Sequence, residues 1–192
     1  MGTSRLEAFS DGVIAVIITI MVLDLRAPSG NDFAALGPVI PTVVAYVLSF
    51  VYLGIYWNNH HHMLHTTETV TGGILWANLH LLFWLSLVPV TTAWLDLSHA
   101  AAAPAAVYGV VLLMAAIAYW ILQQRIIAAQ GPDSLLREAV RHDWKGKGSP
   151  LLYAVAITTA LRWPTVAIVI YTVVAIIWLV PDRRIERVLG VR

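Results

Sequence analysis

The densest cluster of residues capable of chemistry is the stretch 58–65, which reads Asn-Asn-His-His-His-Met-Leu-His. On a helix, His61 and His65 would share one face, at a spacing that zinc ligands use. The stretch contains no Asp or Cys that could complete a metal centre. We therefore expect no metal here, and interpret these histidines as hydrogen-bond partners of neighbouring helices or as wetted side chains at an interface. A pH-sensing role is the alternative, because the pKa of histidine permits it.

Other polar residues interrupt long apolar stretches. Ser10 and Asp11 enter the first such stretch, and Asn78 and His80 lie inside a later one. Polar groups surrounded by apolar material must find partners. We expect these four residues, together with His60 or His61, to satisfy one another in a structural network, which we prefer to a direct contact with a substrate.

Catalytic signatures are missing from the sequence. It contains no P-loop, no Gly-x-Ser-x-Gly and no His-Glu-x-x-His motif, so the motifs of nucleotide-binding proteins, serine hydrolases and zinc proteases do not occur. Carboxylates in apolar stretches are limited to Asp11 and, near the ends, Asp24 and Asp96. The absence of cysteine excludes disulfides and thiolate metal sites. We predict that the protein is not an enzyme and has no cofactor.

The segment Thr69-Val-Thr-Gly-Gly73 resembles a potassium selectivity filter only superficially. A carbonyl filter has the order Thr-Val-Gly-Tyr-Gly between two pore helices. Here the order differs, the tyrosine is missing, and the segment directly precedes an apolar stretch. We interpret it as a loop followed by the start of a helix.

The composition is that of a membrane protein. The chain has 192 residues, of which 59% are apolar and 12% charged, and the mean hydropathy is +0.74. A soluble domain carries about 25% charged residues, and one core cannot bury this surplus of apolar side chains. Eight Trp and seven Tyr suit membrane interfaces. The net charge of +1 gives no reason to expect a nucleic-acid partner. We expect no cleavable signal peptide, because the first apolar stretch lacks a cationic leader and contains Asp11.

The pattern predicts an all-α membrane protein with one domain over residues 1–192. A membrane-spanning helix needs about 20 mostly apolar residues. Six stretches meet or approach this length, at about 8–25, 37–58, 72–95, 104–124, 148–162 and 164–181. The last two are separated by Arg162-Trp-Pro164, which predicts a tight helical hairpin because proline favours a helix start.

Lysine and arginine placement predicts the orientation. With the N-terminus in the cytoplasm, ten basic residues fall on the cytoplasmic side and two outside. The ten are Arg5, Arg125, Arg137, Arg141, Lys145, Lys147, Arg183, Arg184, Arg187 and Arg192, and the two are Arg26 and Arg162. We expect a multi-pass protein of the cell membrane with both termini cytoplasmic.

The loop 125–149 has an amphipathic pattern. Part of it combines apolar Leu135, Leu136, Ala139 and Val140 with charged Arg137, Glu138 and Arg141, which lie between or directly after them. This pattern predicts a short helix at the membrane surface.

The first apolar stretch has a distinct face when it is drawn as a helix. At about 100° per residue, one stripe contains Arg5, Phe9, Gly12, Val16, Thr19 with Ile20, and Leu23. Asp11 falls almost opposite, so it would point back into the protein if the stripe faced a central axis. Because nearly every residue from 13 to 23 is apolar, the periodicity alone does not select a pore face. On the residues alone we prefer ordinary helix packing, with a pore lining as the alternative.

Three segments of the first half resemble one known family. The start, Arg5-Leu-Glu-Ala-Phe-Ser-Asp-Gly-Val13, resembles the Arg-x-x-x-Phe-Ser-Asp signature of the transmembrane protein 175 family of potassium channels, which occurs in lysosomes and many prokaryotes. The other two segments are similar to its second and third helices. They are Tyr56-Trp-x-x-His-His61 and Trp76-x-Asn-x-x-x-Leu-Phe-x-x-Ser-Leu-x-Pro-x-Thr-Thr-x-Trp94. Beyond residue 104, only length and hydropathy agree with the family.

The resemblance implies a particular architecture and function. Prokaryotic members of the family have six helices per chain and form homotetramers around the first helix. By resemblance, Val16, Ile20 and Leu23 form the pore constriction and Thr19 a hydroxyl layer that coordinates the ion. Val16 is smaller than the family's usual Ile or Leu, and Asp24 stands where the family has Glu. The signature network then comprises Arg5, Phe9, Ser10, Asp11, His60, His61, Asn78 and His80.

We accordingly predict a potassium channel with a modest preference over sodium, a hydrophobic constriction and no carbonyl filter. Its partners would be other copies of the chain, the lipid bilayer and permeant cations. The alternative is a proton-coupled secondary transporter that uses Asp11 and the histidine cluster. A helical partner protein that transports nothing is a third possibility.

Overall fold

The computed structural model describes residues 2–131, 134–140 and 144–179, and these contain helices and no strand. The elements, in chain order, are α1 (Thr3–Val22), the 3-10 helix η1 (Phe33–Val39), α2 (Ile40–His65), α3 (Gly72–Ser86), α4 (Val88–Leu97), α5 (Ala102–Gln130), α6 (Leu135–Val140), α7 (Trp144–Ala160) and α8 (Pro164–Leu179).

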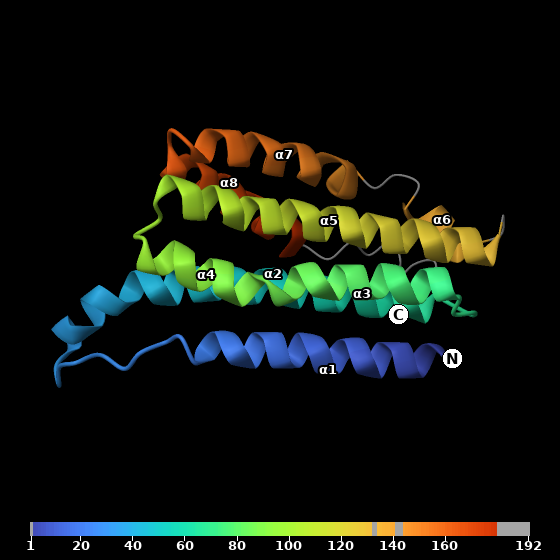
Figure 1. The fold of residues 1–192 in the computed structure, drawn as a ribbon, viewed down its shortest axis with the longest axis horizontal. Helices are drawn as coiled ribbons and strands as arrows, with labels where there is room; N and C mark the ends of the chain where they lie inside the picture. Colours follow the sequence, from blue (N-terminus) through green and yellow to red (C-terminus); the bar gives the residue numbers. More distant parts are fainter. Residues whose placement is uncertain (1, 132–133, 141–143, 180–192) are drawn as a thin grey trace.

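The long helix α5 lies in the middle of the bundle and packs against α3, α4, α7 and α8 (Figure 1). Helix α1 lies at one edge, where it contacts α2, α3 and α4. Most of the bundle therefore forms around α5, while α1 is attached along one side.

Local sequence explains where the helices begin and break. The third predicted stretch, 72–95, divides into α3 and α4, because Pro89 in the first turn of α4 lacks an N–H group and its ring displaces the preceding turn. Thr71 is the N-cap of α3 and its hydroxyl accepts a hydrogen bond from the Ile74 amide. The segment 69–73 is thus a loop and a helix start, as predicted. Pro164 begins α8 directly after the predicted turn.

Several helices extend beyond the predicted limits. Helix α1 begins five residues earlier than residue 8 and so includes Arg5 and Glu7. Helix α2 continues to His65, which places the histidine cluster on a helix rather than in a loop. The predicted surface helix is α6, in which Leu136 is buried and Arg137 is exposed. Arg141 and the basic residues after 180 lie outside the described residues.

The core has two parts. In the first, apolar residues of α1 pack with residues of α2, α3 and α5. The second is formed mainly by α5, α7 and α8, with Tyr52 of α2 among them. There the Tyr52 hydroxyl donates to the Tyr171 carbonyl at 2.5 Å, and the Tyr171 hydroxyl donates to the Ala105 carbonyl at 3.1 Å. A glycine is required at position 109, next to the Tyr171 side chain, since a Cβ there would lie 2.0 Å from the Tyr171 hydroxyl oxygen.

Among the described residues, three helical segments are long and apolar enough to cross a membrane: Phe33–His65, Gly72–Leu97 and Ala102–Gln130. Helix α8 is apolar but has only 16 residues. Helix α1 carries three charged side chains, and α7 has 17 residues. The structure is therefore that of a helical membrane protein, and the count of six spans stays a prediction.

The two ends of the bundle contain different connections. The start of α1, the end of α2 and α6 lie at one end (Figure 1). The α1–α2, α4–α5 and α7–α8 connections lie at the opposite end. The first end includes elements that carry Arg5 and Arg137, whereas Arg26 and Arg162 belong to connections at the second.

Candidate pore face and its supporting network

The two faces of α1 differ in burial. Every third or fourth residue is buried against the rest of the chain, namely Leu6, Ser10, Ile14, Ile17 and Met21. The residues between them on the outward side are exposed: Phe9 by 50%, Val16 by 55%, Ile20 by 48% and Leu23 by 79%. An apolar stripe of this kind on an edge helix is available to lipid or to another chain. The stripe read from the sequence is therefore the outward face of α1.

Thr19 and Gly12 are also exposed on this face. The Thr19 hydroxyl donates to the Val16 carbonyl oxygen at 2.9 Å. Because the hydroxyl proton is used in this bond, the oxygen lone pairs remain available to accept a hydrogen bond or to coordinate a cation. A Cβ at Gly12 would meet no atom within 4 Å, so this position leaves α1 accessible.

An open groove runs beside the stripe, where α1 faces the break between α3 and α4. Phe9, Val16 and Ile20 line one side, and Pro89 and Val90 line the other. The break in the third helix thus contributes to the shape of the surface next to α1.

The inward face of α1 is held by a buried chain of hydrogen bonds. His60 Nε2 lies 2.7 Å from Asn78 Oδ1, Asn78 Nδ2 donates to Ser10 Oγ at 2.9 Å, and Ser10 Oγ donates to the Leu6 carbonyl at 2.8 Å. All three polar side chains are completely buried. Since Asn78 Oδ1 can only accept, His60 Nε2 is the donor in this bond, and the other ring nitrogen is Nδ1. That Nδ1 atom has no hydrogen-bond partner among the described residues.

Two further contacts join α1 to α2. Trp57 Nε1 donates to Asp11 Oδ1 at 3.0 Å, and His61 Nδ1 lies 2.7 Å from Glu7 Oε1. Asp11 thus faces its own chain, as its place on the helical wheel predicts. Together with the buried chain, these contacts fix α1 along about two turns.

The structure brings together only part of the predicted network. Ser10, Asn78 and His60 bond to one another, while Asp11 and His61 pair with other residues. Arg5 and Phe9 are exposed, and His80 accepts a hydrogen bond from Trp84 of its own helix at 2.9 Å. These three lie outside the chain of hydrogen bonds because their positions on α1 and α3 do not face the α1–α2–α3 contact.

Sequence reasoning missed Glu7 and Trp57 as partners. The available signal was their spacing: Glu7 precedes Asp11 by four residues, and Trp57 precedes His61 by four. Residues four apart lie on the same helix face. Two such pairs on two packed helices can therefore form two successive contacts.

The two acidic residues near the helix ends have different surroundings. Asp96 accepts from Thr42 Oγ1 with both carboxylate oxygens, at 3.0 and 2.9 Å, and so is fixed to α2. Asp24 is exposed just beyond α1 and borders the groove. Asp24 and Asp96 also line a small cavity together with Thr42.

The fold and these contacts define a class: an all-α membrane protein in which an edge helix is anchored by polar bonds on one face and presents an exposed apolar stripe on the other.

Comparison with known proteins identifies the family. The profile described as "Endosomal/lysosomal potassium channel TMEM175" matches residues 5–89. A protein of Chryseobacterium sp. (strain P1-3) that is named as a potassium channel is 54% identical over 187 residues, which is 97% of each chain. The mouse protein named endosomal/lysosomal proton channel TMEM175 is 38% identical over 89 residues, 39% of this chain and 18% of that protein.

A solved structure agrees with this assignment. The crystal structure of a lysosomal potassium-selective channel TMEM175 homolog from Chamaesiphon minutus has a TM-score of 0.76 and 25% identity, and the match covers 94% of this chain and 97% of that one. The chain belongs to the TMEM175 family. Since this is a family of ion channels, the chain is not an enzyme.

Proposed function

We propose that this chain is a potassium channel that assembles as a homotetramer, with four copies of α1 around a central pore. The observation that carries the proposal is the exposed apolar stripe of Val16, Ile20 and Leu23, on a helix whose buried residues lie on its other face. The proposal is supported by the potassium-channel name of the Chryseobacterium relative and by the similarity to the Chamaesiphon structure.

The tetramer follows from what a single chain cannot do alone. One helix exposes one face to a pore and cannot enclose it. A closed ring of identical chains would surround the path and cover the groove beside α1 with a neighbouring copy. Cyclic symmetry would then place each of the three apolar residues in a ring of four.

These rings would act as a hydrophobic gate. From Val16 to Leu23 the path is about 10 Å long. A narrow apolar path of this length holds no continuous water, and a bare ion meets a steep desolvation barrier there. Widening the rings would admit hydrated or partly hydrated cations. Selectivity would come from ring size together with hydroxyl coordination, because the chain has no carbonyl filter motif.

Two polar residues would assist the ion. The Thr19 oxygen keeps free lone pairs and can replace part of the hydration shell of potassium. Asp24, exposed beyond Leu23, would concentrate cations near the mouth of the pore. The preference for potassium over sodium would be modest, since a hydroxyl layer offers fewer ligands than a carbonyl filter.

We further propose six spans per chain in the cell membrane, with both termini cytoplasmic. The excess of basic residues in the elements at the α6 end of the bundle supports this orientation.

The test is reconstitution of the purified chain in planar bilayers, with measurement of bi-ionic reversal potentials and of oligomer mass on the same preparation. We expect a mass of four chains, current without a coupled ion, and a reversal potential that indicates potassium preference. A monomeric mass, or no conductance, would contradict the proposal. Because the mouse relative is named a proton channel, the reversal potential is also measured under a proton gradient. A reversal potential that follows only the proton gradient would favour a proton path instead.

A further inference from the structure

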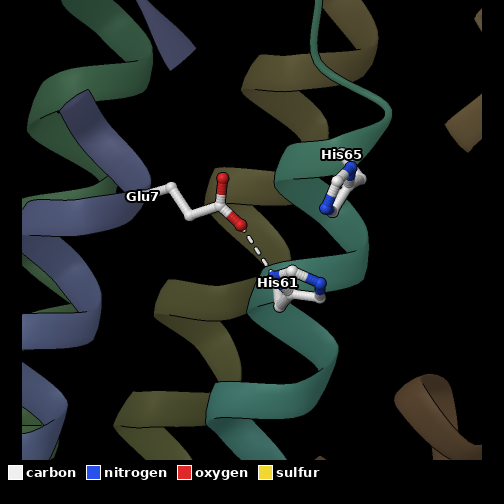
Figure 2. A group of neighbouring side chains, drawn as sticks. All are labelled: Glu7, His61 and His65. Atoms are coloured by element: carbon white, nitrogen blue, oxygen red, sulfur yellow. Dashed lines mark hydrogen bonds and ion pairs between the residues drawn. The ribbon is translucent and has the colours of Figure 1, made fainter. Parts of the chain in front are cut away.

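Glu7, His61 and His65 form a compact cluster between α1 and α2. One donor atom from each lies within 4.8 Å of the other two. Figure 2 shows the Glu7 carboxylate of α1 pointing toward the two imidazoles, which project from successive turns of α2. The His61 and His65 rings are 4.5 Å apart between centroids and nearly perpendicular. The carboxylate that the histidine stretch lacks in the sequence is thus supplied by another helix.

The donor set suits a divalent transition metal. Two imidazole nitrogens and one carboxylate oxygen are ligands for zinc, with bonds of about 2.0–2.2 Å. Two ligand atoms on a tetrahedral ion with such bonds lie about 3.4 Å apart. The three donors therefore need to approach by little more than about 1 Å, which rotation of the exposed His65 side chain can provide.

The surroundings of the cluster allow an ion to enter. The side chains of Glu7 and His61 are 23% and 39% exposed, and His65 is exposed. Water can therefore reach the cluster and occupy a fourth coordination position. The Trp57 ring stacks on His61 at 6.3 Å between centroids, which restricts the orientation of that imidazole.

We propose that Glu7, His61 and His65 bind a divalent transition metal ion of the zinc class, and that the bound ion holds α1 against α2. On binding, the ion replaces any proton shared between Glu7 and His61 and forms one bond to each of the three side chains. Helix α1 is thereby joined to α2 two turns before Val16. The binding step stands by itself, whereas an effect on current rests on the proposed channel function.

Binding is tested by isothermal titration of the full-length chain in detergent with zinc chloride. We expect one zinc per chain in the wild type and at least tenfold weaker binding in His65→Ala and in Glu7→Gln. Both side chains are accessible, and size-exclusion elution checks that the variants remain folded. The matched control is His80→Gln, which alters a histidine bonded within α3 and should leave affinity within twofold. Absence of zinc binding, or equal affinity in all four proteins, would overturn the site.

The mechanical consequence is tested by adding zinc to reconstituted channels. We expect zinc to reduce the potassium current of the wild type and of His80→Gln, and to leave His65→Ala unaffected. Zinc that binds through these residues without changing the current would refute the effect on α1. A chain that binds zinc in this ligand-dependent way but conducts nothing would support the metal site and refute the channel function.

Discussion

The two faces of α1 present opposite chemistry on one helix. The inward face combines buried apolar residues with Ser10, whose hydroxyl is part of a completely buried chain of hydrogen bonds to α2 and α3. From Phe9 to Leu23 the outward face is exposed and mainly apolar. Its Thr19 hydroxyl donates to the Val16 carbonyl of the same helix. The buried hydrogen bonds from α1 to the neighbouring helices are therefore made on the inward face.

This difference separates stability from conduction. Residues on the inward face fix the position and rotation of α1, so changing them should affect folding. Phe9, Val16, Ile20 and Leu23 on the outward face are 48–79% exposed, so changing them should leave folding intact and alter the path of the ion. Substitutions at neighbouring residues of α1 should accordingly change different measurements, namely the free energy of unfolding for the inward face and the ion current for the outward face.

The largest expected effect is on the outward face, at the proposed constriction. Ile20→Ala and Leu23→Ala would widen their rings and lower the desolvation barrier that excludes sodium. We expect larger currents and a permeability ratio of potassium to sodium that falls toward one, measured as bi-ionic reversal potentials in bilayers. If both variants keep wild-type current and selectivity, the hydrophobic constriction is wrong.

A pair of adjacent residues tests the comparison directly. Ile17 is buried, whereas Val16, about 100° away around the helix, is exposed. Ile17→Ala would leave a cavity in the core and lower the free energy of unfolding by about 2–4 kcal/mol, whereas Val16→Ala should change it by less than about 0.5 kcal/mol. Denaturant unfolding in mixed micelles, followed by circular dichroism, measures both.

The same pair should exchange roles when current is measured. Val16→Ala should alter conductance or selectivity, and Ile17→Ala channels that remain folded should keep wild-type selectivity. Equal destabilisation by the two substitutions would show that α1 does not have a free outward face.

The helices and the stripe of α1 could be predicted because they depend on local periodicity. A run such as that of α5 is apolar over so many residues that only a helix can satisfy its backbone in lipid. The outward stripe follows from the helical repeat, and its exposure agrees with that reading. The break at Pro89 also has a local cause, although it was not predicted within the stretch 72–95.

The partners of polar residues could not be predicted, because they depend on how helices rotate against one another. His60 and His61 are adjacent in the sequence, yet one bonds to Asn78 of α3 and the other to Glu7 of α1. Periodicity indicates that both need partners and does not say which helix supplies them. Similarly, His80 bonds within its own helix, at a spacing of four residues that a local reading could have identified.

The smallest of these effects concerns the buried hydrogen bonds of the inward face. Asn78→Leu keeps the approximate volume of the side chain but leaves His60 Nε2 and one lone pair of Ser10 without partners. We expect the free energy of unfolding to fall by about 2–3 kcal/mol, since an unpaired buried polar group costs about 1–3 kcal/mol.

The matched control is Asn58→Leu, at an exposed position of α2, which should change stability by less than about 0.5 kcal/mol. A double substitution adds a sharper test. If Asn78 stabilises the fold through Ser10, Ser10→Ala should cost less in the Asn78→Leu background than in the wild type, because the bond is already lost. Additive costs would mean that the two side chains act independently and that the Asn78–Ser10 hydrogen bond does not hold the inward face.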